Sequence, residues 1–367
     1  MSRSPLKQLQ AARSLASTKN VLAGLDGFVD KIVIPVATRH GAGEAFEPIK
    51  TLTEFGLRVQ AAAGKSTNIE LHPRMEKLGG NGPLMAGALQ AYGTELKYIG
   101  TLGAKSPVGA LADFAAGSAA ITLGEPGLTT AIEFSDGKLM LGITSDFGNV
   151  DRARLLERTG GEAGLRALTA KADLVALVNW TMLPHMTDIF RVFVENILPA
   201  LPAKPTRQFF FDLADPEKRT DAEILEALQT IARFESFGRA TLGLNFKEAE
   251  HVGRVLGVAS AGEEEAPLRQ LAADIRARLK LSTVVVHPRK TAACATAEGT
   301  FFVVGPYCET PLVTTGAGDH FNAGFALGQL LGLTPDACLA TGVATSGLYV
   351  RSGVSPTLDD LEKSLPA

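Results

Sequence analysis

The segment from Thr314 to Phe325, TTGAGDHFNAGF, places a Gly-Ala-Gly turn directly before an apolar run of helix-forming residues. The first amides of such a helix have no acceptor within the helix, and the helix dipole adds partial positive charge there. A phosphate could bind against these amides, because Gly316 and Gly318 allow close approach to the backbone. Asp319 could then accept a proton from an attacking hydroxyl group. A plain helix capped by Asp319 after a glycine turn fits the segment equally well.

The composition is that of an ordinary soluble enzyme. Of the 367 residues, 46% are hydrophobic, and the net charge of -3 gives no basic surplus for binding nucleic acid. Residues 1–20 lack the apolar core of a signal peptide, so we expect an amphipathic leading helix there, and no later window is apolar enough to span a membrane. The widely spaced Cys294, Cys308 and Cys338 indicate neither a disulfide framework nor a metal cluster. We therefore expect a cytoplasmic protein whose partner is a small molecule, not nucleic acid or a membrane.

Short apolar runs alternate with segments of helical periodicity through most of the chain. This alternation predicts an α/β fold with a largely parallel sheet covered by helices on both faces. Ligand sites in such sheets lie beyond the carboxyl ends of the strands. The expected strands are 21–25, 96–101, 174–178, 208–212, 241–244, 283–286, 292–296 and 301–304. The expected helices are 83–92, 107–116, 187–197, 221–234, 247–256 and 267–280.

Two stretches, 31–78 and 127–148, break this rhythm with an extended, β-like character. The second stretch contains a hairpin signal, because Asp136-Gly137 forms a turn sequence between two strand-like runs. We expect the two stretches to form a small sheet apart from the main one.

Asn245 and Glu248 follow an expected strand and open a helix, so they could share one face at the carboxyl edge of the sheet. An amide oxygen and a carboxylate in that place suit Mg²⁺, which keeps several waters and takes few protein ligands. In isolation, the pair is more simply a capping box whose side chains only close the helix start. Asp212 and Asp215 end another expected strand at the same edge.

Two further glycine-containing turns carry polar residues. Asp26 and Asp30 follow the first expected strand, and Gly80-Asn81 precedes an expected helix. Glycines let a ligand approach the backbone, and carboxylates or amides can hold hydroxyl groups at defined angles. Two plain turns are the alternative interpretation.

Taken in order, these motifs resemble the PfkB, or ribokinase-like, family of carbohydrate kinases over most of the chain, with the segment from Thr314 to Phe325 as the specific signature. The resemblance implies ATP-dependent transfer of the γ-phosphate to a hydroxyl group of a sugar or sugar-like molecule. It implies a three-layer α/β/α core with a mainly parallel sheet, formed by residues 1–30, 79–126 and 149–367. Residues 31–78 and 127–148 match the family's small β-sheet lid, which often mediates homodimers.

The resemblance also implies a role for each motif. Asp319 would be the base, and the helix start at Gly316, Ala317 and Gly318 would be the anion hole. The nucleotide would be bound by Asn245, Glu248 and Thr315, of which Asn245 and Glu248 would also place Mg²⁺ through water. The acceptor would be bound by Asp30, Asp26, Gly80 and Asn81.

Several positions depart from the family pattern. Val313 stands where the signature usually begins with Asp, so the resemblance does not carry over the monovalent-cation site that many members build there. Leu84 replaces an Asn of the double-glycine motif, and His287 stands where the family tends toward Thr-x-Gly. These departures leave open a catalytically weak sugar-binding regulator on the same fold. A nucleoside kinase also stays open, although an aromatic content of 6% favours a sugar acceptor.

Overall fold

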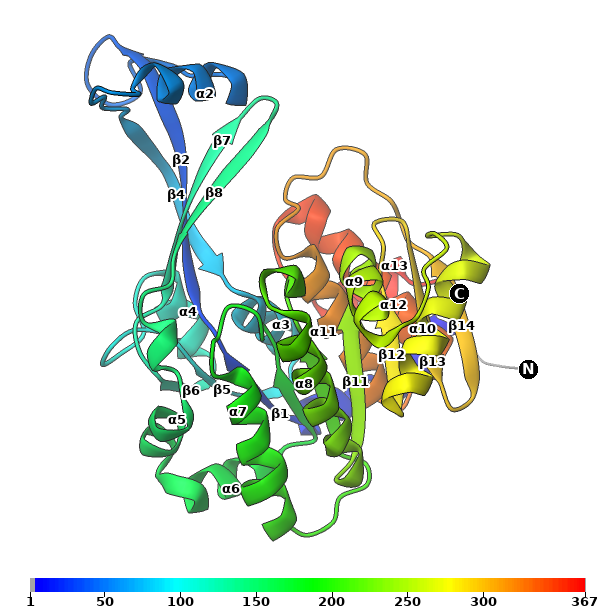
Figure 1. Ribbon diagram of the computed structural model, residues 1–367. Helices are drawn as coiled ribbons and strands as arrows, with labels where there is room; N and C mark the ends of the chain where they lie inside the picture. Colours follow the sequence, from blue (N-terminus) through cyan, green and yellow to red (C-terminus); the bar gives the residue numbers. More distant parts are fainter. Residues whose placement is uncertain (1–3, 367) are drawn as a thin grey trace.

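Residues 4–366, which the computed structural model describes, contain two β-sheets (Figure 1). Within these residues the main sheet has nine strands, in the order β14-β13-β12-β11-β10-β9-β1-β5-β6. The strands from β12 to β6 are parallel, and β13 and β14 are antiparallel additions at one edge. The bounds are β1 (Asn20–Leu25), β5 (Glu95–Gly100), β6 (Ala119–Thr122), β9 (Leu174–Leu177), β10 (Gln208–Asp212), β11 (Arg239–Leu244), β12 (Thr283–Val286), β13 (Thr291–Thr296) and β14 (Gly299–Val304).

The prediction of a mainly parallel, doubly covered sheet is confirmed. Its central strands, such as β9 and β12, are almost wholly apolar because both of their faces are buried. In β10, for example, Phe209 and Phe211 pack into the hydrophobic core on one side of the sheet, and Phe210 packs into the core on the other side. The edge strand β6 was not expected from the sequence, because it is short and only half-buried.

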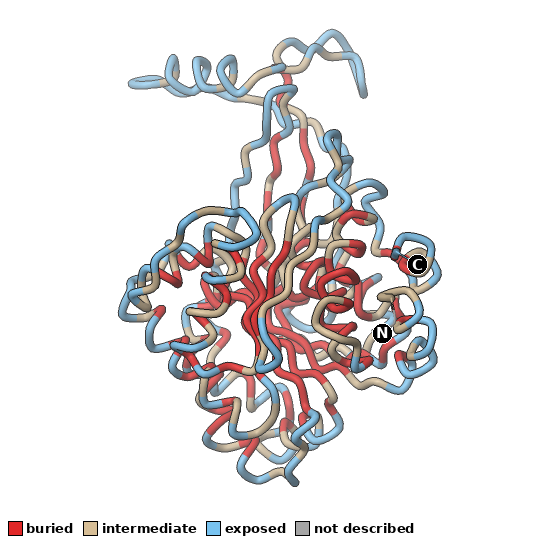
Figure 2. The backbone as a smooth tube through the Cα atoms, turned by 90° about the vertical axis from the view of Figure 1, so that its right-hand side faces the viewer, coloured by how far each residue is buried: buried red, intermediate tan, exposed pale blue. Residues whose placement is uncertain are grey.

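Helices cover both faces of the main sheet (Figure 1). One core contains side chains of α1 (Pro5–Ala12), α3 (Asn81–Ala91), α4 (Ala110–Ala116), α11 (Ala317–Leu330), α12 (Pro335–Ser352) and α13 (Leu358–Ser364). The other core contains side chains of α5 (Arg152–Thr159), α6 (Gly161–Lys171), α7 (Met186–Arg191), α8 (Asp221–Ala232), α9 (Phe246–Leu256) and α10 (Glu265–Leu279). Figure 2 shows both cores as buried chain on either side of the sheet.

Two expected helices differ in detail from the structure. The leading helix is α1 followed by a 3₁₀ segment (Arg13–Thr18), and residues 1–3 of that prediction lie outside the described residues. The helix expected at 187–197 is α7 continued by a π-helical stretch (Val192–Ile197). Among the helices of residues 4–366, none is both long and apolar enough to cross a membrane.

The second sheet projects from the core (Figure 1) and consists of β2 (Phe28–Arg39), β3 (Phe46–Pro48), β4 (Leu71–Gly79), β7 (Gly127–Phe134) and β8 (Gly137–Ile143). The long β2 pairs with β4 on one side and with β7 on the other. The turn at Asp136-Gly137 joins β7 to β8, as expected. Helix α2 (Leu52–Ala61) was not expected; it begins at a capping box formed by Thr51 and Glu54.

Candidate active site

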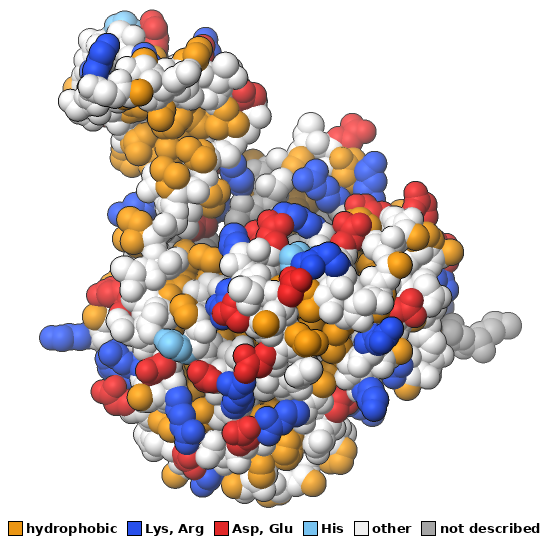
Figure 3. Space-filling view, viewed as in Figure 1, with side chains coloured by type: hydrophobic (Ala, Val, Ile, Leu, Met, Phe, Trp, Pro, Cys, Tyr) orange, Lys and Arg blue, Asp and Glu red, His pale blue; other side chains and the backbone are white. Residues whose placement is uncertain are grey.

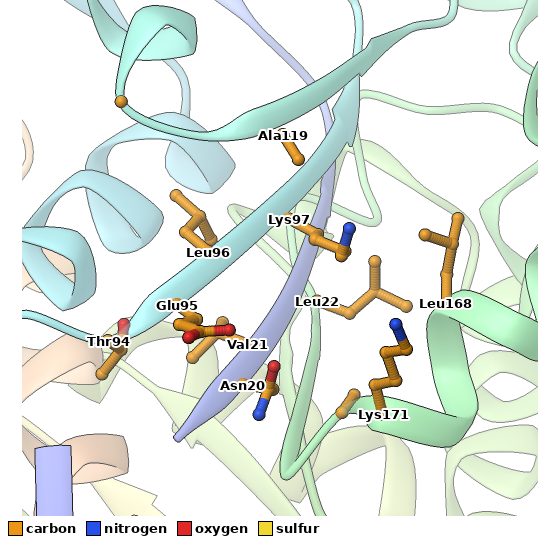
Figure 4. Close-up of a pocket in the computed structure, with 12 residues that line it drawn as sticks. Asn20, Val21, Leu22, Thr94, Glu95, Leu96, Lys97, Ala119, Leu168 and Lys171 are labelled. Atoms are coloured by element: carbon orange, nitrogen blue, oxygen red, sulfur yellow. The ribbon is translucent and has the colours of Figure 1, made fainter. Parts of the chain in front are cut away.

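Asp26, Asp212, Glu248 and Asp319 lie at the carboxyl edge of the main sheet and are buried. Asp26 follows β1, Asp212 ends β10, Glu248 lies in the first turn of α9 after β11, and Asp319 lies in the first turn of α11. The parallel strands bring these otherwise distant acids to one edge. The opposite edge carries a different cavity of about 370 Å³, whose polar lining comes from side chains such as Asn20, Lys97 and Lys171 (Figure 4).

The helix start of α11 has the geometry expected from its glycines. Gly316 is the N-cap with a φ of 92°, which favours glycine. The Ala317 amide donates to the Thr314 carbonyl at 3.3 Å, and the His320 amide donates to the Gly316 carbonyl at 3.0 Å. The amides between them lie in the first turn, which offers no intrahelical acceptor.

Two of the family departures have a structural role around this turn. A Cβ atom added to Gly316 would lie 2.9 Å from Leu84 Cδ1, so Leu84 packs directly against the glycine. The His287 ring packs against Phe321 with 4.6 Å between ring centroids, and its Cε1 would lie 3.3 Å from a Cβ atom at Gly318. Burial lowers the pKa of His287 to about 4, so the ring is neutral at pH 7.

Asp319 is 8% exposed and accepts a hydrogen bond from Asn81 Nδ2 at 2.9 Å. Burial raises the pKa of its carboxyl group to about 8, the charges of Asp26 and Glu248 add to the rise, and the bond from Asn81 opposes it. A carboxyl group with a pKa in this range can exchange a proton near neutral pH.

Asn245 and Glu248 form the capping box that the sequence offered as the simpler alternative. Asn245 Oδ1 accepts from the Glu248 amide at 3.0 Å, and Glu248 Oε2 accepts from the Asn245 amide at 2.9 Å. Glu248 Oε1 also accepts from the Asp215 amide at 3.0 Å. Burial and the neighbouring Asp212 raise the pKa of Glu248 to about 8. The box therefore also places a buried acid near Asp212.

A cavity of about 540 Å³ opens beside the helix start. Its lining includes Ala317 and Gly318 of α11, Asn245 of α9, and His287 with Tyr307 from the antiparallel edge of the sheet. The exposed Arg289 and Lys290 also line this cavity. Lys290 Nζ lies over the Tyr307 ring, 4.6 Å from its centroid, so this cation is held by an aromatic face. Because the sequence predicts that Asn245 binds the nucleotide, we refer to this space as the donor cavity.

A second cavity, of about 530 Å³, lies between the second sheet and the loop that leads into α11. Asp30, Lys77 and Lys138 line it from the sheet, and Thr314 and Thr315 line it from the loop. Lys138 Nζ donates to Thr315 Oγ1 at 2.5 Å. Burial raises the pKa of Asp30, whereas a bond from Thr129 and the charges of the two lysines oppose that rise. Because the sequence predicts that Asp30 binds the acceptor, we refer to this space as the acceptor cavity. Thr314 also lines the donor cavity, so the two cavities adjoin.

The remaining predicted acceptor residues are not among the residues that line either cavity. Gly80 is the N-cap of α3 with a φ of 94°, and Asn81 begins this helix. Asp26 is 0% exposed and accepts hydrogen bonds from the Asn81 and Gly82 amides. Asp26 therefore presents no surface to either cavity.

A family model for prokaryotic ketohexokinase matches residues 7–366 of this chain. The chain belongs to the prokaryotic ketohexokinase family. A ketohexokinase from Haloferax volcanii is 32% identical over 346 residues, which cover 93% of this chain and 89% of that protein. The chain is thus a sugar kinase of the PfkB, or ribokinase-like, type, and the suspected resemblance is confirmed.

Solved structures show that this ketohexokinase-family chain has the ribokinase-like fold. A carbohydrate kinase from Agrobacterium tumefaciens matches with a TM-score of 0.65 at 19% identity, covering 95% of this chain and 98% of that one. Arabidopsis thaliana ribokinase, solved with ribose and ATP, matches with a TM-score of 0.64 at 17% identity, covering 95% and 99%.

Sequence reasoning did not single out Asn179 and Asn322, which both contact the acids of this site. Asn322 Nδ2 donates to Asp212 Oδ2 at 2.7 Å, and Asn179 Nδ2 donates to Asp26 Oδ2 at 2.6 Å. Among residues 4–366, the Oδ1 atoms of both amides are buried without a partner. A search for polar residues just after each parallel strand would have found Asn179, and Asn322 lies within the signature segment itself.

The carboxylate oxygens of this site suit a hard divalent cation. Burial raises the pKa of Asp212 to about 7, and the charge of Asp319 adds to that rise. Asp212, Glu248 and Asp319 thus raise one another's pKa, which a bound cation would relieve. No group of three acidic, histidine or cysteine side chains within residues 4–366 is close enough to ligate a metal directly. Mg²⁺ ligated mainly by water and phosphate oxygens is compatible with this arrangement.

Proposed function

We propose that this protein transfers the γ-phosphate of ATP to a hydroxyl group of a ketohexose such as fructose. The observation that carries the proposal is the position of Asp319 in the first turn of α11, a few residues after Thr314, which lines both the donor and the acceptor cavity. Membership of the ketohexokinase family supports the acceptor class. ATP as donor is supported by the donor cavity at the helix start, because helix N-termini bind phosphate groups.

In the proposed reaction, a sugar hydroxyl attacks the γ-phosphorus of ATP in line with the leaving ADP oxygen. The new sugar oxygen–phosphorus bond forms as the bond to ADP breaks, and Asp319 takes the proton of the hydroxyl group. The amides at Gly316, Ala317 and Gly318 would form the anion hole for charge on the moving phosphoryl group. Of these, Gly318 has the freer amide, because that of Ala317 already contacts the Thr314 carbonyl.

Asn245, Glu248 and Thr315 are the proposed partners of the nucleotide. Asn245 lines the donor cavity, and Thr315 lies on the loop between the two cavities. Asn245 and Glu248 would hold Mg²⁺ through water, and the metal would neutralise charge on the phosphate oxygens. Val313 lacks an oxygen ligand in its side chain, so we do not propose a monovalent-cation site there.

Asp30, Gly80 and Asn81 are the proposed partners of the sugar. In the acceptor cavity, the carboxylates of Asp30 and Glu133 balance the ammonium groups of Lys77 and Lys138. A cavity with mixed and balanced charge suits an uncharged molecule with many hydroxyl groups, because each hydroxyl can both donate and accept. This balance favours a free sugar over a sugar phosphate as acceptor.

The second sheet is the proposed lid, comprising residues 31–78 and 127–148 around a core of 1–30, 79–126 and 149–367. Alternate residues of β7 and β8 point away from the acceptor cavity, and on that outer face Leu128, Leu141 and Ile143 are 40%, 49% and 61% exposed. Figure 3 shows hydrophobic side chains gathered on this projecting sheet. We propose that a second copy of the chain covers this face, because exposed apolar patches of monomers are usually small.

Free thiols at Cys294, Cys308 and Cys338 support a cytoplasmic location.

The test is ADP release from ATP and Mg²⁺ with fructose, other ketohexoses, aldohexoses and adenosine as acceptors. We expect fructose to be phosphorylated, and Asp319→Asn to lower kcat by roughly 10³-fold or more, because it removes the base without changing side-chain size. Asp336→Asn is the matched control, since Asp336 lies in the first turn of the next helix, α12. An Asp319→Asn protein as fast as the parent would contradict the role of Asp319, and adenosine as the preferred acceptor would contradict the sugar assignment.

A further inference from the structure

Asp26 sits at the centre of a buried hydrogen-bond network. Its Oδ2 accepts from the Asn81 amide at 3.0 Å and from Asn179 Nδ2 at 2.6 Å, and its Oδ1 accepts from the Gly82 amide at 2.8 Å. Tyr98 donates its hydroxyl hydrogen to the Asp26 carbonyl at 2.6 Å. The network therefore joins the ends of β1, β5 and β9 to the start of α3.

The turn at Gly80–Gly82 packs so closely against Asp26 and Tyr98 that there is no room for larger side chains. A Cβ atom at Gly80 would lie 2.8 Å from Asp26 Oδ2, and one at Gly82 would lie 2.6 Å from Asp26 Oδ1 and 2.1 Å from the Tyr98 hydroxyl oxygen. Glycine at both positions lets the turn close onto the carboxylate. The three groups that bond the Asp26 carboxyl oxygens are all N–H donors, so an ionised carboxylate is the form that satisfies all of them.

Asn81 connects this network to the proposed base. Its backbone amide is held by Asp26, while its side-chain Nδ2 donates to Asp319 Oδ1 at 2.9 Å. Asp319 has little freedom of its own, because it is 8% exposed at the start of α11. A shift of the turn at Gly80–Gly82 would therefore move the hydrogen-bond donor that orients Asp319.

We propose that Asp26 is a positioning residue for phosphoryl transfer, which fixes the Gly80–Gly82 turn so that Asn81 holds Asp319 toward the attacking hydroxyl group. Asp26 itself touches neither substrate, because it is 0% exposed. The proposal rests on the proposed role of Asp319 as the base. It gives Asp26 a task different from that of Asp30, the other acid of the segment from Gly24 to Asp30, which lines the acceptor cavity.

The first experiment compares Asp26→Asn with the parent in steady-state kinetics. Asparagine has the same size but offers one acceptor oxygen, so at least one N–H of the turn or of Asn179 loses its partner. We expect kcat to fall roughly 10- to 100-fold, as small displacements of catalytic groups do. The affinity for ADP, measured by calorimetry, should stay within about twofold, because the donor cavity does not include this turn.

A double-mutant cycle tests the route through Asn81. Asn81→Ala keeps the backbone amide that Asp26 holds, yet removes the donor to Asp319. If Asp26 acts through Asn81, the double variant should have about the same kcat as the more impaired single variant. Should Asp26→Asn fail to fold, Asn179→Ala replaces it in the same cycle, because it removes one partner of Asp26 and leaves the carboxylate in place.

Tyr92→Phe is the control for a purely structural effect. It removes a buried hydrogen bond of 2.7 Å to Thr345 at the other end of α3, far from the Gly80–Gly82 turn. We expect it to lower Tm with kcat nearly unchanged. The proposal is overturned if Tyr92→Phe loses as much kcat as Asp26→Asn, if the effects of Asp26→Asn and Asn81→Ala multiply, or if Asp26→Asn raises only KM for the sugar.

The same measurements separate this proposal from the proposed function. If Asp319→Asn is inactive while Asp26→Asn retains the kcat of the parent, only the positioning role of Asp26 is wrong. If Asp319→Asn is as active as the parent, the role of Asp319 is wrong. In that case, a crystal structure of Asp26→Asn still tests the geometry, since the Asn81 side chain should leave Asp319 Oδ1.

Discussion

The carboxyl edge of the main sheet and the projecting second sheet differ in how they hold their polar groups. At the edge, Asp26, Asp212 and Asp319 are buried, and N–H donors of neighbouring elements hold their carboxyl oxygens. On the second sheet, Lys138 is exposed and contacts the core through Thr315, while Ile143 on the other face is 61% exposed. One region is enclosed by the fold, and the other is open to solvent.

This difference separates two tasks of the proposed kinase. Proton transfer requires a carboxylate with a fixed direction and a pKa near neutrality, and both come from burial at strand ends. Recognition of a sugar requires donors and acceptors that reach it from one side, which an open sheet can provide. Changes at the edge should therefore be costly, whereas changes on the second sheet should be mild.

The largest expected effect is a loss of stability at high pH. Burial raises the pKa of Asp319 and of Glu248 to about 8, far above the values of unfolded carboxyl groups. The folded state thus binds more protons than the unfolded state between about pH 4 and 8. The free energy of unfolding should be greatest below this window and fall as pH rises toward 8, by roughly 1 kcal/mol per pH unit for each such group.

Urea unfolding of the ligand-free protein between pH 6 and 9 measures this slope. Asp319→Asn should make the fall in the free energy of unfolding with pH less steep, by the contribution of about one proton, because the amide does not titrate. A free energy of unfolding that rises between pH 6 and 8 would contradict the raised pKa values of these buried acids.

A pair of glycine substitutions compares the two regions directly. In Gly82→Ala the new Cβ atom would lie 2.1 Å from the Tyr98 hydroxyl oxygen, whereas in Gly142→Ala on β8 nothing lies within 4 Å of it. We expect Gly82→Ala to destabilise the protein by about 1–3 kcal/mol through overpacking. Gly142→Ala should change stability by less than about 0.5 kcal/mol, as surface substitutions usually do.

Thermal unfolding and kcat of both variants decide the comparison. Gly82→Ala should also lose activity, because the turn that carries Asn81 must shift. Equal losses of Tm in the two variants would show that the edge is no less tolerant than the second sheet.

Much of this contrast could be predicted from local sequence patterns. Continuous apolar runs located the buried strands, and the glycine turn before Asp319 located the helix start. The pair Asn245 and Glu248 was predicted both as a capping box and as a nucleotide and metal site, and the structure contains the capping box. Such features depend on residues a few positions apart, so the sequence contains their physical cause.

The features that were not predicted depend on distant parts of the chain. Asp26-Gly27 has the composition of an exposed turn, yet Asp26 is fully buried because α3 and β9 bring Asn81 and Asn179 against it. Lys138 meets Thr315 across 177 positions. Neither contact has a local signature, since both follow from the register of strands in two sheets.

On the second sheet, Lys138→Ala should have a moderate effect. The variant removes one of the two lysines that line the acceptor cavity, the one that donates to Thr315, but no buried network depends on it. We expect KM for the sugar to rise about three- to tenfold, in line with the net value of one hydrogen bond, with kcat little changed. Lys31→Ala is the matched control, because Lys31 is exposed and alternation along β2 points it away from Asp30 and the cavity. A variant that lowers kcat and leaves KM for the sugar unchanged would place Lys138 at the transferred phosphate instead.

The smallest effect on stability is expected for Ile143→Lys on the outer face of the second sheet. Ile143 is already 61% exposed, so the free energy of unfolding of a monomer should change by less than about 0.5 kcal/mol. A lysine in the middle of an apolar contact between copies is costly, however, so the variant should shift a dimer toward monomer in light scattering coupled to gel filtration. Leu225→Lys on α8 of the core is the control, because Leu225 is also an exposed apolar residue, at 37%, but lies outside the proposed contact. A dimer that persists in Ile143→Lys would exclude this face as the contact, and a parent protein that is monomeric at high concentration would exclude the dimer itself.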